Sequence, residues 1–373
     1  MRTAFVTGSA GFIGFHLSKL LLEEGFRVVG YDALTDYYDP ALKRRRHAML
    51  RQHPHFSAHE ARLEDMETLA AACREARPDV IVHLAAQAGV RYSLENPRAY
   101  VDTNLVGAFN MLECARELGI GHLLMASTSS VYGANEIMPF DERQKVDTQL
   151  TLYAATKKAN ESMAHSYAHI WKIPTTMFRF FTVYGPWGRP DMALFKFVAA
   201  GLEGRPIEVY NHGQMARDFT YVTDLVRGIR LLIDVPPPQV DGRREAIEGD
   251  SLSAAAPYRV VNIGNSESVP LLEFIDRIEE EIGRPIERTY LGMQKGDVPA
   301  TWADASLLER LTGYRPNTPV RQGIREFVRW YCDYYGVKSA GPGKNRPGRE
   351  KVMAMPPMAD ISALRSTQPE AAP

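Results

Sequence analysis

A glycine-rich turn near the start of the chain, between a strand and a helix, constrains the fold more than any other feature. Residues 3–6 are short and β-prone, and the turn over residues 7–14 has the spacing Gly-x-x-Gly-x-x-Gly. Apolar residues then recur at helical spacing over residues 13–22. A helix start offers unpaired backbone N–H groups to a phosphate, and glycine lets a pyrophosphate approach the backbone. The turn predicts a dinucleotide site with contacts from Gly8, Gly11, Phe12, Ile13 and Gly14.

An acidic residue ends the second predicted strand, residues 27–32. Asp32 lies 18 residues beyond Gly14. A carboxylate at this distance accepts hydrogen bonds from a ribose diol and repels a 2′-phosphate. Asp32 therefore favours NAD over NADP. The alternative is that Asp32 caps the next helix.

Strand and helix patterns alternate from residue 1 to about residue 180. Nearly all-apolar runs of strand length are typical of parallel strands that are buried on both faces. These runs are residues 79–86, 122–127 and 174–179, and long helical patterns cover residues 97–118 and 151–171. This order predicts an α/β fold with a doubly wound parallel sheet of the Rossmann type.

The regular alternation ends near residue 181. We expect residues 1–180 to form the nucleotide-binding domain and residues 181–335 to form mainly a smaller, mixed α/β substrate domain. The pattern leaves open whether some of the later strands and helices return to the first domain. Residues 234–257 contain three consecutive prolines, which predicts an exposed, mobile loop. Residues 336–373 are rich in Gly, Pro, Ala and Ser, which predicts a disordered tail.

The composition excludes several classes of protein. The 373 residues carry 44 basic and 45 acidic side chains, so the net charge of −1 gives no general attraction to nucleic acid or to an anionic membrane. The three cysteines are scattered, form no disulfide framework and match no metal motif, so we expect no metal. We find neither an apolar run long enough to span a bilayer nor a signal-peptide pattern. We therefore expect a cytoplasmic protein.

Two smaller patterns have bland interpretations. The basic run at residues 43–46 lies on a predicted helix, and we expect a solvated face, with contact to a cofactor phosphate as the alternative. His53, His55 and His59 alternate along a predicted third strand. They lack partners placed to complete a metal site.

A tyrosine and a lysine are spaced to share one face of the helix predicted over residues 151–171. Tyr153 and Lys157 are four residues apart. An ammonium group beside a phenol, with an oxidised nicotinamide nearby, lowers the tyrosine pKa from about 10. Tyr153 is therefore the predicted general base. Thr128, at the end of the preceding buried strand, can hydrogen-bond the same substrate oxygen; a helix cap or a loop hydroxyl is its alternative role.

Taken together, these residues resemble the extended short-chain dehydrogenase/reductase family and, within it, the nucleotide-sugar epimerases. The resemblance covers residues 1 to about 335 and rests on the glycine turn, Asp32, residues 83–86, Asn104, Thr128, Tyr153 and Lys157. It implies NAD as the cofactor, with further contacts from Leu63, Leu84, Ala85, Ala86, Asn104, Ser127, Tyr153 and Lys157. Relatives usually carry Asp where Arg62 stands, so the usual carboxylate contact to adenine is not available there.

Four longer stretches, residues 87–93, 178–186, 189–192 and 217–221, resemble the UDP-glucuronate 4-epimerases of this family. The resemblance implies that Tyr153 takes the C4 hydroxyl proton while the C4 hydride passes to NAD. The 4-keto sugar then turns in the pocket, the hydride returns to its other face, and NAD is retained. Such enzymes supply UDP-galacturonate for surface polysaccharide. The family also implies a homodimer through the helices over residues 97–118 and 151–171.

Other functions remain open at this point. Within enzymes, the alternatives are a UDP-glucose or UDP-N-acetylhexosamine 4-epimerase, a UDP-glucuronate decarboxylase, and epimerisation at C5. From another class, the alternative is an NAD-sensing binding protein that has lost the chemistry.

A UDP-uronic acid carries two phosphate charges and a carboxylate. Because the chain as a whole is nearly neutral, individual basic side chains at the site have to bind these negative charges. Arg217 matches the family position that holds the pyrophosphate. Arg91 and Arg189 are candidates for the acidic sugar, because guanidinium groups bind carboxylates through two bonds. A surface salt bridge is the alternative for each arginine. Thr182 stands where glucose-type epimerases usually carry Asn, which favours the uronic-acid branch.

Two serines distinguish this chain from relatives that catalyse other reactions. The dehydratases carry Asp-Glu where Ser129 and Ser130 stand, and the decarboxylases carry Glu in place of Ser130. Serine cannot supply a carboxyl acid and base. A 4-keto glucuronate is a β-keto acid that readily loses carbon dioxide. Our hypothesis is that Ser129, Ser130 and Arg189 hold its carboxylate so that the breaking bond is poorly aligned with the carbonyl.

Overall fold

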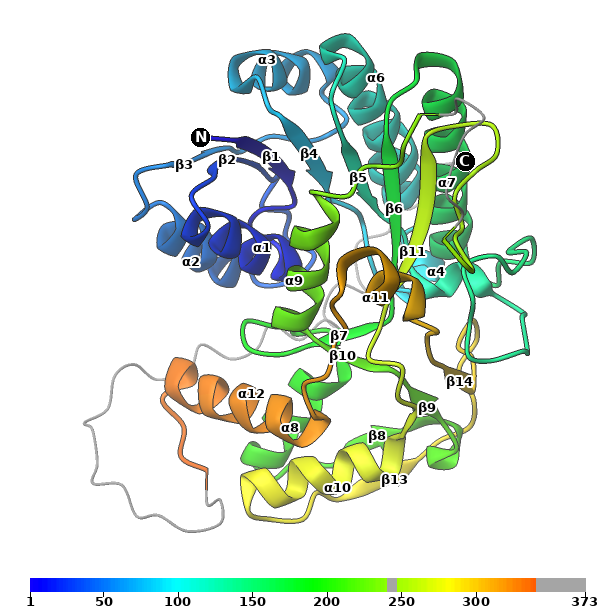
Figure 1. Ribbon diagram of the computed structural model, residues 1–373. Helices are drawn as coiled ribbons and strands as arrows, with labels where there is room; N and C mark the ends of the chain where they lie inside the picture. The colour runs from blue at the N-terminus through cyan, green and yellow to red at the C-terminus, as the bar shows by residue number, and fades with distance from the viewer. Residues whose placement is uncertain (240–246, 340–373) are drawn as a thin grey trace, which may run out of the picture.

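A parallel sheet forms the centre of the larger part of the molecule (Figure 1). The computed structural model describes residues 1–239 and 247–339. In these residues seven strands form one sheet in the order β11-β6-β5-β4-β1-β2-β3, and every neighbouring pair is parallel. The strands are β1 (Thr3–Thr7), β2 (Arg27–Tyr31), β3 (Phe56–His59), β4 (Val80–His83), β5 (Leu123–Ala126), β6 (Thr175–Phe180) and β11 (Tyr258–Ile263). The order steps outward from β1 in both directions, which confirms the doubly wound topology.

Side chains of β1 alternate between two buried faces of the sheet. Ala4 and Val6 belong to one apolar cluster with Phe15, whereas Phe5 belongs to another with Met111. Helices cover both faces, which explains the continuous apolar runs in the sequence. The helices are α1 (Phe12–Glu23), α2 (Pro40–Leu50) and α9 (Val222–Leu232) on the first face, and α3 (Met66–Ala76), α6 (Ala108–Leu118) and α7 (Leu152–Trp171) on the second. No helix in the described ranges is long and apolar enough to cross a membrane.

The helical pattern over residues 97–118 is one continuous segment whose winding changes in the middle. It comprises α5 (Pro97–Tyr100), the π-helix η1 (Val101–Gly107) and α6. Gly107 lies against Leu63, because a Cβ on Gly107 would be 2.7 Å from the Leu63 Cβ. Apolar spacing predicts a helix here but does not distinguish a π turn from an α turn.

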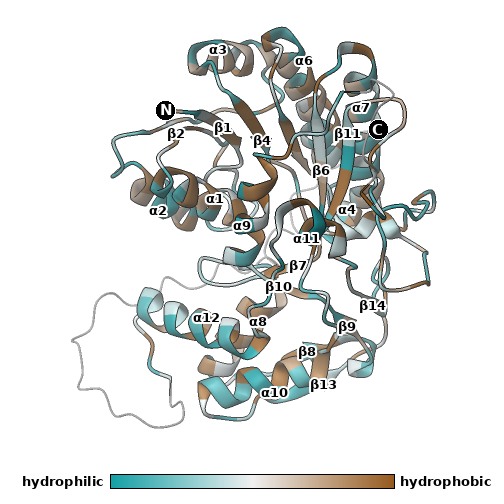
Figure 2. Cartoon of the chain, in the orientation of Figure 1, coloured by the Kyte–Doolittle hydropathy of each residue, from teal (hydrophilic) through white to brown (hydrophobic). Residues whose placement is uncertain are grey.

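A second layer, built around a third apolar cluster, lies below the sheet in Figure 1. Its helices are α8 (Ala193–Glu203), α10 (Leu271–Ile282) and α12 (Val320–Tyr335). Buried residues recur along one side of α10 and α12, whereas hydrophilic residues occupy the remainder of each helix (Figure 2). The small sheets pair β8 (Ile207–Val209) with β13 (Arg288–Tyr290), β7 (Thr182–Tyr184) with β10 (Phe219–Tyr221), and β9 (Ala216–Arg217) with β12 (Val269–Pro270) and β14 (Ala300–Thr301). The shorter helical turns are α4 (Tyr92–Glu95), α11 (Ser306–Thr312), η2 (Ser129–Tyr132) and η3 (Tyr210–Gly213).

Two elements of the later chain return to the parallel sheet. Strand β11 pairs with β6 over its whole length, and helix α9 packs against α1. The chain beyond residue 181 therefore contributes to both layers, which is the arrangement that the sequence left open.

Two expectations from the sequence are wrong in part. The basic run at residues 43–46 forms a solvated face only at Arg44 and Arg45, which are exposed, because Lys43 and Arg46 are 6% and 0% exposed. Residues three apart share one side of a helix, and on this side of α2 Lys43 donates to the Thr35 carbonyl and Arg46 to the Ala10 carbonyl. The third strand, β3, begins at Phe56, so His53 and His55 precede it.

The predicted loop and tail lie partly outside the described residues, which omit residues 240–246 and 340–373. The described residues 247–257 are not all exposed, and contacts with the rest of the fold hold part of this segment in place. Ala256 is fully buried, and Arg259 donates two hydrogen bonds of 2.9 Å to the Asp250 carboxylate.

Candidate active site

In the turn between β1 and α1, the three glycine positions leave no room for a side chain. Gly8 has φ +74°, and a Cβ there would be 2.9 Å from the Ala85 backbone nitrogen. A Cβ on Gly14 would be 2.0 Å from the Gly8 carbonyl oxygen. The Gly11 N–H donates to that same oxygen at 2.9 Å. The backbone therefore closes on itself and presents the start of α1, where the N-cap residue is Gly11 and no side chain caps the helix.

Asp32 is fixed at the end of β2 by two backbone donors. Its carboxylate accepts hydrogen bonds from the N–H groups of Ala10 at 3.0 Å and Leu34 at 2.9 Å. It does not cap the next helix, because the N-cap of α2 is Asp39, which accepts from the Ala41 N–H at 2.8 Å. Of the two interpretations of Asp32, the structure thus rules out the helix cap and leaves its carboxylate in the wall of a pocket.

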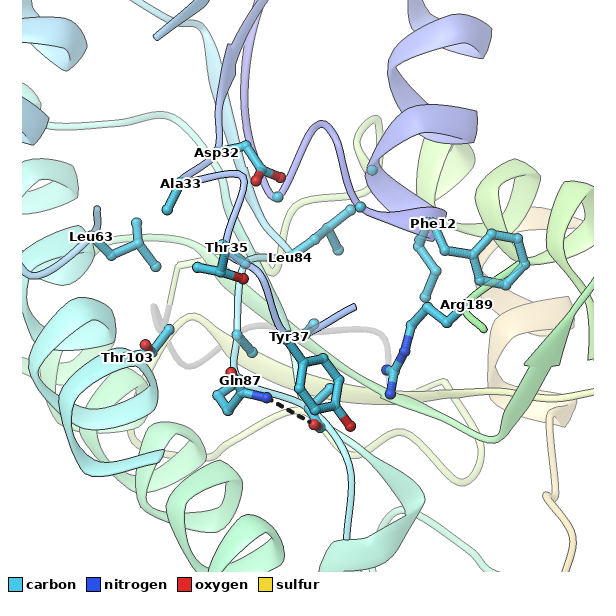
Figure 3. Close-up of a pocket in the computed structure, with 18 of the residues that line it drawn as sticks. Phe12, Asp32, Ala33, Thr35, Tyr37, Leu63, Leu84, Gln87, Thr103 and Arg189 are labelled. Atoms are coloured by element: carbon cyan, nitrogen blue, oxygen red, sulfur yellow. Dashed lines mark hydrogen bonds between the residues drawn. The ribbon is translucent and has the colours of Figure 1, made fainter. Parts of the chain in front are cut away.

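One pocket runs along the carboxyl edge of the sheet, and Figure 3 shows part of its lining. Most of the residues predicted for the cofactor line it, namely Gly8, Gly11, Phe12, Ile13, Gly14, Asp32, Leu63, Leu84, Ala85, Ala86, Ser127, Tyr153 and Lys157. Thr128 and Arg189 line the same pocket. Arg62 also lines it, at the position where relatives usually carry Asp.

Asn104 is buried in η1 and does not line this pocket. Its side chain accepts from the Gln87 N–H at 2.8 Å and donates to the Gln87 carbonyl at 3.0 Å. Gln87 itself lines the pocket. Asn104 therefore fixes the backbone of a pocket loop instead of facing the cavity.

Sequence reasoning does not find several lining residues, among them Thr35, Tyr37 and Tyr38 from the segment after β2, and Gln87 and Thr103. Lys43 also lines the pocket, which agrees with the alternative given for the basic run rather than with its main interpretation. The Lys43 ammonium donates to the Thr35 carbonyl at 2.6 Å and to the Thr35 hydroxyl at 2.9 Å. Burial lowers the pKa of Lys43 to about 8. The signal for Lys43 was present in the basic run, but a helical run alone does not tell which of its residues face inward.

Tyr153 and Lys157 lie on the first turns of α7, directly after its N-cap. The Thr151 hydroxyl accepts from the Ala154 N–H at 3.2 Å and fixes this helix start. Burial raises the pKa of Tyr153, while the Thr128 hydroxyl and the Arg189 charge act in the opposite direction. Burial lowers the pKa of Lys157 to about 8. The chain alone thus favours the neutral phenol, so the lowered tyrosine pKa predicted from the sequence requires a further positive charge, such as that of an oxidised nicotinamide.

The predicted arginines fall into two groups. Arg189 lines the pocket and is paired with Asp191, its Nε lying 3.0 Å from Asp191 Oδ1. Arg217 and Arg91 meet at another carboxylate outside the pocket lining: Arg217 Nη2 lies 2.7 Å and Arg91 Nη2 4.0 Å from Asp297 oxygens. Sequence spacing gave no sign of Asp297.

The remaining predicted substrate residues surround the end of β5 and the start of β7. The Ser130 N–H donates to the Thr128 hydroxyl at 3.2 Å, so η2 keeps both serines directly beside Thr128. Thr182 lines a smaller hollow that shares Arg189 and Met192 with the main pocket. In the described residues, no group of three His, Cys, Asp or Glu side chains is arranged to hold a metal ion.

The strand order, the glycine turn, Asp32 and the Tyr153–Lys157 pair define a nucleotide-dependent protein of the short-chain dehydrogenase/reductase class. The residues fit a dinucleotide, because Gly8, Gly11 and Gly14 carry no Cβ and Asp32 lines the same pocket, where a carboxylate can accept hydrogen bonds from a ribose diol. The chain belongs to the NAD dependent epimerase/dehydratase family, whose model matches residues 4–244. NAD is its cofactor.

Several known proteins are similar over nearly the whole described chain. A protein of Rhizobium meliloti named "Probable UDP-glucuronate 4-epimerase" is 56% identical over 330 residues, which are 88% of this chain and 97% of the relative. UDP-glucuronate 4-epimerase 4 of Arabidopsis thaliana is 43% identical over 344 residues, 91% of this chain and 77% of the relative. The crystal structure of the UDP-glucuronic acid 4-epimerase from Bacillus cereus, in complex with UDP-glucuronic acid and NAD, matches with a TM-score of 0.79 and 29% identity, covering 90% of this chain and 100% of that one.

Proposed function

We infer that the chain is an NAD-retaining UDP-glucuronate 4-epimerase, an isomerase that interconverts UDP-glucuronate and UDP-galacturonate. The observation that carries this function is that Tyr153, Thr128 and Arg189 line the same pocket as the glycine turn. One cavity thus combines a proton acceptor, a cofactor cradle and a cation suited to an acidic sugar. The 56% identity to the Rhizobium meliloti relative supports the same reaction. Its product serves as a precursor of surface polysaccharide.

The reaction uses the side chains at the end of the pocket near α7. Bound NAD supplies the acceptor for the C4 hydride and returns it later. Tyr153 takes the proton of the C4 hydroxyl, and the positive charges of Lys157 and Arg189 favour its phenolate. The Thr128 hydroxyl orients the same oxygen. After the 4-keto sugar has turned, Tyr153 gives the proton back to the C4 oxygen.

The sugar and nucleotide are held by two separate groups of side chains. Ser129, Ser130 and Arg189 hold the uronate carboxylate, so that the bond to the carboxyl carbon is poorly aligned with the C4 carbonyl and carbon dioxide is not lost. Thr182 borders the same region. Arg217 binds the diphosphate. The sequence made Arg91 a candidate for the acidic sugar, but we assign it to the diphosphate as well, because Asp297 pairs with both arginines in the chain alone. We propose that residues 1–180 mainly bind NAD and that residues 181–335 mainly bind the UDP-sugar, with Ser129, Ser130 and Arg91 reaching the substrate from the first range.

We propose a homodimer through α7 and the segment from α5 to α6. These helices pack side by side, and they expose large apolar residues: Val106 and Phe109 are 43% and 46% exposed, and Ile170 and Trp171 are 57% and 44% exposed. Exposed apolar groups on two adjacent helices are typical of an interface. Phe109→Glu should convert a dimer into a monomer in light scattering, whereas Met293→Glu, at an exposed position away from these helices, should leave the mass unchanged.

The proposed reaction is tested by incubating the purified protein with UDP-glucuronate, without added cofactor, and following products by proton NMR. UDP-galacturonate is the expected product, and NAD is expected in the supernatant after denaturation. UDP-xylose instead would indicate a decarboxylase, and turnover of UDP-glucose alone would indicate a neutral-sugar epimerase. Bound NAD without turnover of any UDP-sugar would indicate a sensor and overturn the proposal.

A further inference from the structure

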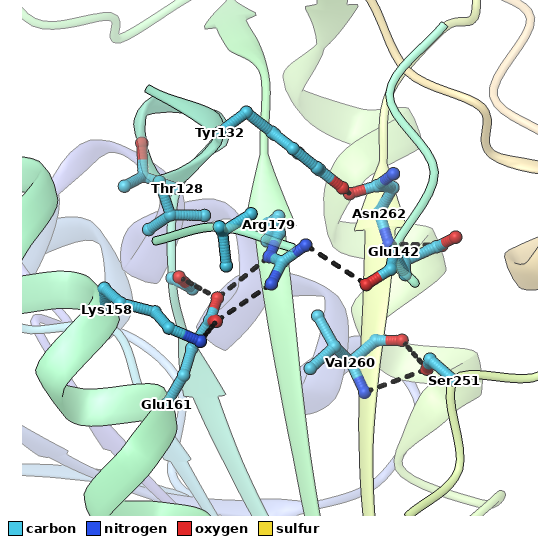
Figure 4. Close-up of polar contacts among 12 residues, drawn as sticks. Thr128, Tyr132, Glu142, Lys158, Glu161, Arg179, Ser251, Val260 and Asn262 are labelled. Atoms are coloured by element: carbon cyan, nitrogen blue, oxygen red, sulfur yellow. Dashed lines mark hydrogen bonds and ion pairs between the residues drawn. The ribbon is translucent and has the colours of Figure 1, made fainter. Parts of the chain in front are cut away.

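A buried ion pair lies one helical turn beyond Lys157, the second of the two proposed reactive residues at the start of α7. Glu161 and Arg179, on α7 and β6, have side chains that are 2% and 3% exposed. Arg179 donates from Nε to Glu161 Oε1 and from Nη2 to Oε2, both at 2.9 Å (Figure 4). Burial disfavours the carboxylate, but Arg179 and Ser127 outweigh it and lower the pKa of Glu161. Glu161 is therefore an anion inside the fold.

The Glu161 carboxylate lies near both parts of the chain that carry the proposed chemistry, the end of β5 before Thr128 and the start of α7. Ser127, the residue before Thr128, donates its hydroxyl to Glu161 Oε1 at 2.7 Å. The Ser127 N–H donates to the Phe178 carbonyl at 2.7 Å, so the end of β5 is fixed at both its backbone and its side chain. Lys157 lies one helical turn before Glu161 on the same helix.

Lys157 needs an anion in this position. It is 2% exposed, and burial disfavours its charge. To stabilise the Tyr153 phenolate, it has to remain charged while Tyr153 loses its proton. Glu161 attracts the Lys157 charge, whereas His83 on β4, which also interacts with Lys157, is kept neutral by burial with a pKa of about 3.

Within the part of the chain that the structure describes, the other charged and titratable groups around the ion pair supply no second negative charge beside Lys157. Lys158 lies on the partly exposed side of α7, with its Nζ 3.5 Å from Glu161 Oε2. The Arg179 guanidinium carbon lies over the ring of Tyr132 in η2, 4.8 Å from the ring centre. Tyr258 of β11 interacts with Glu161 and keeps its proton, because burial raises its pKa. Glu142 accepts from the Asn262 N–H at 2.8 Å at the far end of this network.

We propose that Glu161, held by Arg179, is a positioning residue of the reaction, which keeps Lys157 cationic and anchors Ser127 beside Thr128. The inference rests on the proposed function, because it concerns the residues that move the C4 proton. Arg179 has two effects: it keeps Glu161 ionised, and it occupies both carboxylate oxygens so that the group cannot rotate away from Ser127. Loss of Glu161 alone leaves Arg179 as a buried, unpaired cation, which further opposes the charge on Lys157.

The test measures the charge of Lys157 directly, by the pH dependence of its Cε chemical shift in protein labelled with ¹³C-lysine and assigned with Lys157→Met. Glu161→Gln should lower the midpoint of this titration by about one pH unit or more, since a nearby opposite charge shifts a pKa by roughly 1–3 units. The alkaline limb of kcat should move down by the same amount. Glu142→Gln is the control at another buried acid: burial raises the pKa of Glu142 to about 7, and Glu142 contacts Arg179 only through its backbone carbonyl, which the substitution keeps. It should leave both midpoints unchanged.

A double variant keeps the test valid where Glu161→Gln fails to fold. Glu161→Gln with Arg179→Met removes both charges, which proteins often tolerate. It should lower the Lys157 midpoint in the same direction but by less, because the opposing cation is also gone. An unchanged midpoint in the double variant, or an equal fall in Glu142→Gln, overturns the inference. The NMR titration needs no turnover, so failure of the wild-type chain to convert UDP-glucuronate would refute the proposed function separately.

Discussion

Arg189, which lines the cofactor pocket (Figure 3), forms a two-bond ion pair with Asp191. Tyr37 donates its hydroxyl to the same carboxylate at 3.1 Å. Burial disfavours the guanidinium charge, but Asp191 outweighs this effect and raises the pKa of Arg189. Arg189 is therefore charged and held in one orientation before any substrate arrives.

The fixed orientation of Arg189 leads to a prediction about products. Arg189→Met should raise the KM for UDP-glucuronate by about 10- to 100-fold, because a hydrogen bond to a charged group contributes roughly 1.5–3 kcal/mol. It should also produce UDP-pentose, since a loosely held carboxylate can align for loss of carbon dioxide. Product NMR and initial rates check both effects. Arg205→Met, at an exposed arginine, is the control. Normal binding with an unchanged product ratio would contradict the role of Arg189.

The pH dependence of turnover should report Lys157. Burial lowers its pKa in the folded chain from 10.5 to about 8. Below pH 8 the ammonium is present and supports the phenolate, and as the pH rises through about 8 this support is lost. We therefore expect kcat to fall on the alkaline side with a midpoint near pH 8. A profile that stays flat to pH 9.5 would show that turnover does not depend on this charge.

Thr128 should control the acidic side of the same profile. The Thr128 hydroxyl lowers the pKa of Tyr153, against the stronger opposite effect of burial. Thr128→Val removes this contribution, so Tyr153 should hold its proton to higher pH and the acidic limb of kcat/KM should move upward. Thr128→Ser, which keeps the hydroxyl, should restore the wild-type limb. An acidic limb that does not move in Thr128→Val would separate Thr128 from the proton transfer.

Local sequence patterns predict the main strands and helices of this molecule, because each of these elements depends on residues that are close together in the sequence. The parallel strands follow from apolar runs, and the start of α1 follows from the spacing of three glycines. The helix from Thr151 to Trp171 was placed within one residue, since Thr151 is its cap. The fold class and the cofactor are confirmed by the sheet order and the family match.

Contacts between distant parts of the chain were not predictable in the same way. The basic run gave no reason to bury Arg46, yet its guanidinium donates to the Ala10 carbonyl at 2.9 Å and to the Trp187 carbonyl at 2.5 Å. These contacts join the glycine turn to the loop before Arg189. Asp297 likewise meets Arg91 and Arg217, the nearer of which is 80 positions away in the sequence. No periodicity encodes such pairs, because they depend on how the two layers meet.

The glycine turn should be intolerant of even one methyl group. In Gly14→Ala the new Cβ would meet the Gly8 carbonyl oxygen at 2.0 Å, and because this oxygen belongs to the backbone it cannot turn aside as a flexible side chain would. We expect a loss of about 1–3 kcal/mol in the free energy of unfolding, the usual cost of overpacking, together with loss of co-purifying NAD. Gly121→Ala is the control, since its nearest contact is the Asp79 carbonyl at 3.6 Å. Denaturant titration and the NAD content of the purified variants check this, and a stable, NAD-loaded Gly14→Ala would refute it.

The two arginines that meet at Asp297 should contribute unequally to diphosphate binding. The Arg217 side chain is 19% exposed and lies 2.7 Å from the Asp297 carboxylate, whereas Arg91 is 50% exposed and lies 4.0 Å away. A charge that is partly desolvated and fixed binds phosphate more strongly than one on a mobile, solvated side chain. Arg217→Met should therefore raise the KM by about 10-fold or more, while Arg91→Met should change it by less than about 5-fold, as expected for an exposed pair worth roughly 0.2–1 kcal/mol. Free UDP as a competitive inhibitor isolates the effect, because it lacks the sugar: its inhibition constant should rise in Arg217→Met as steeply as the KM. An inhibition constant that rises more in Arg91→Met would reverse the assignment and move the diphosphate toward α4.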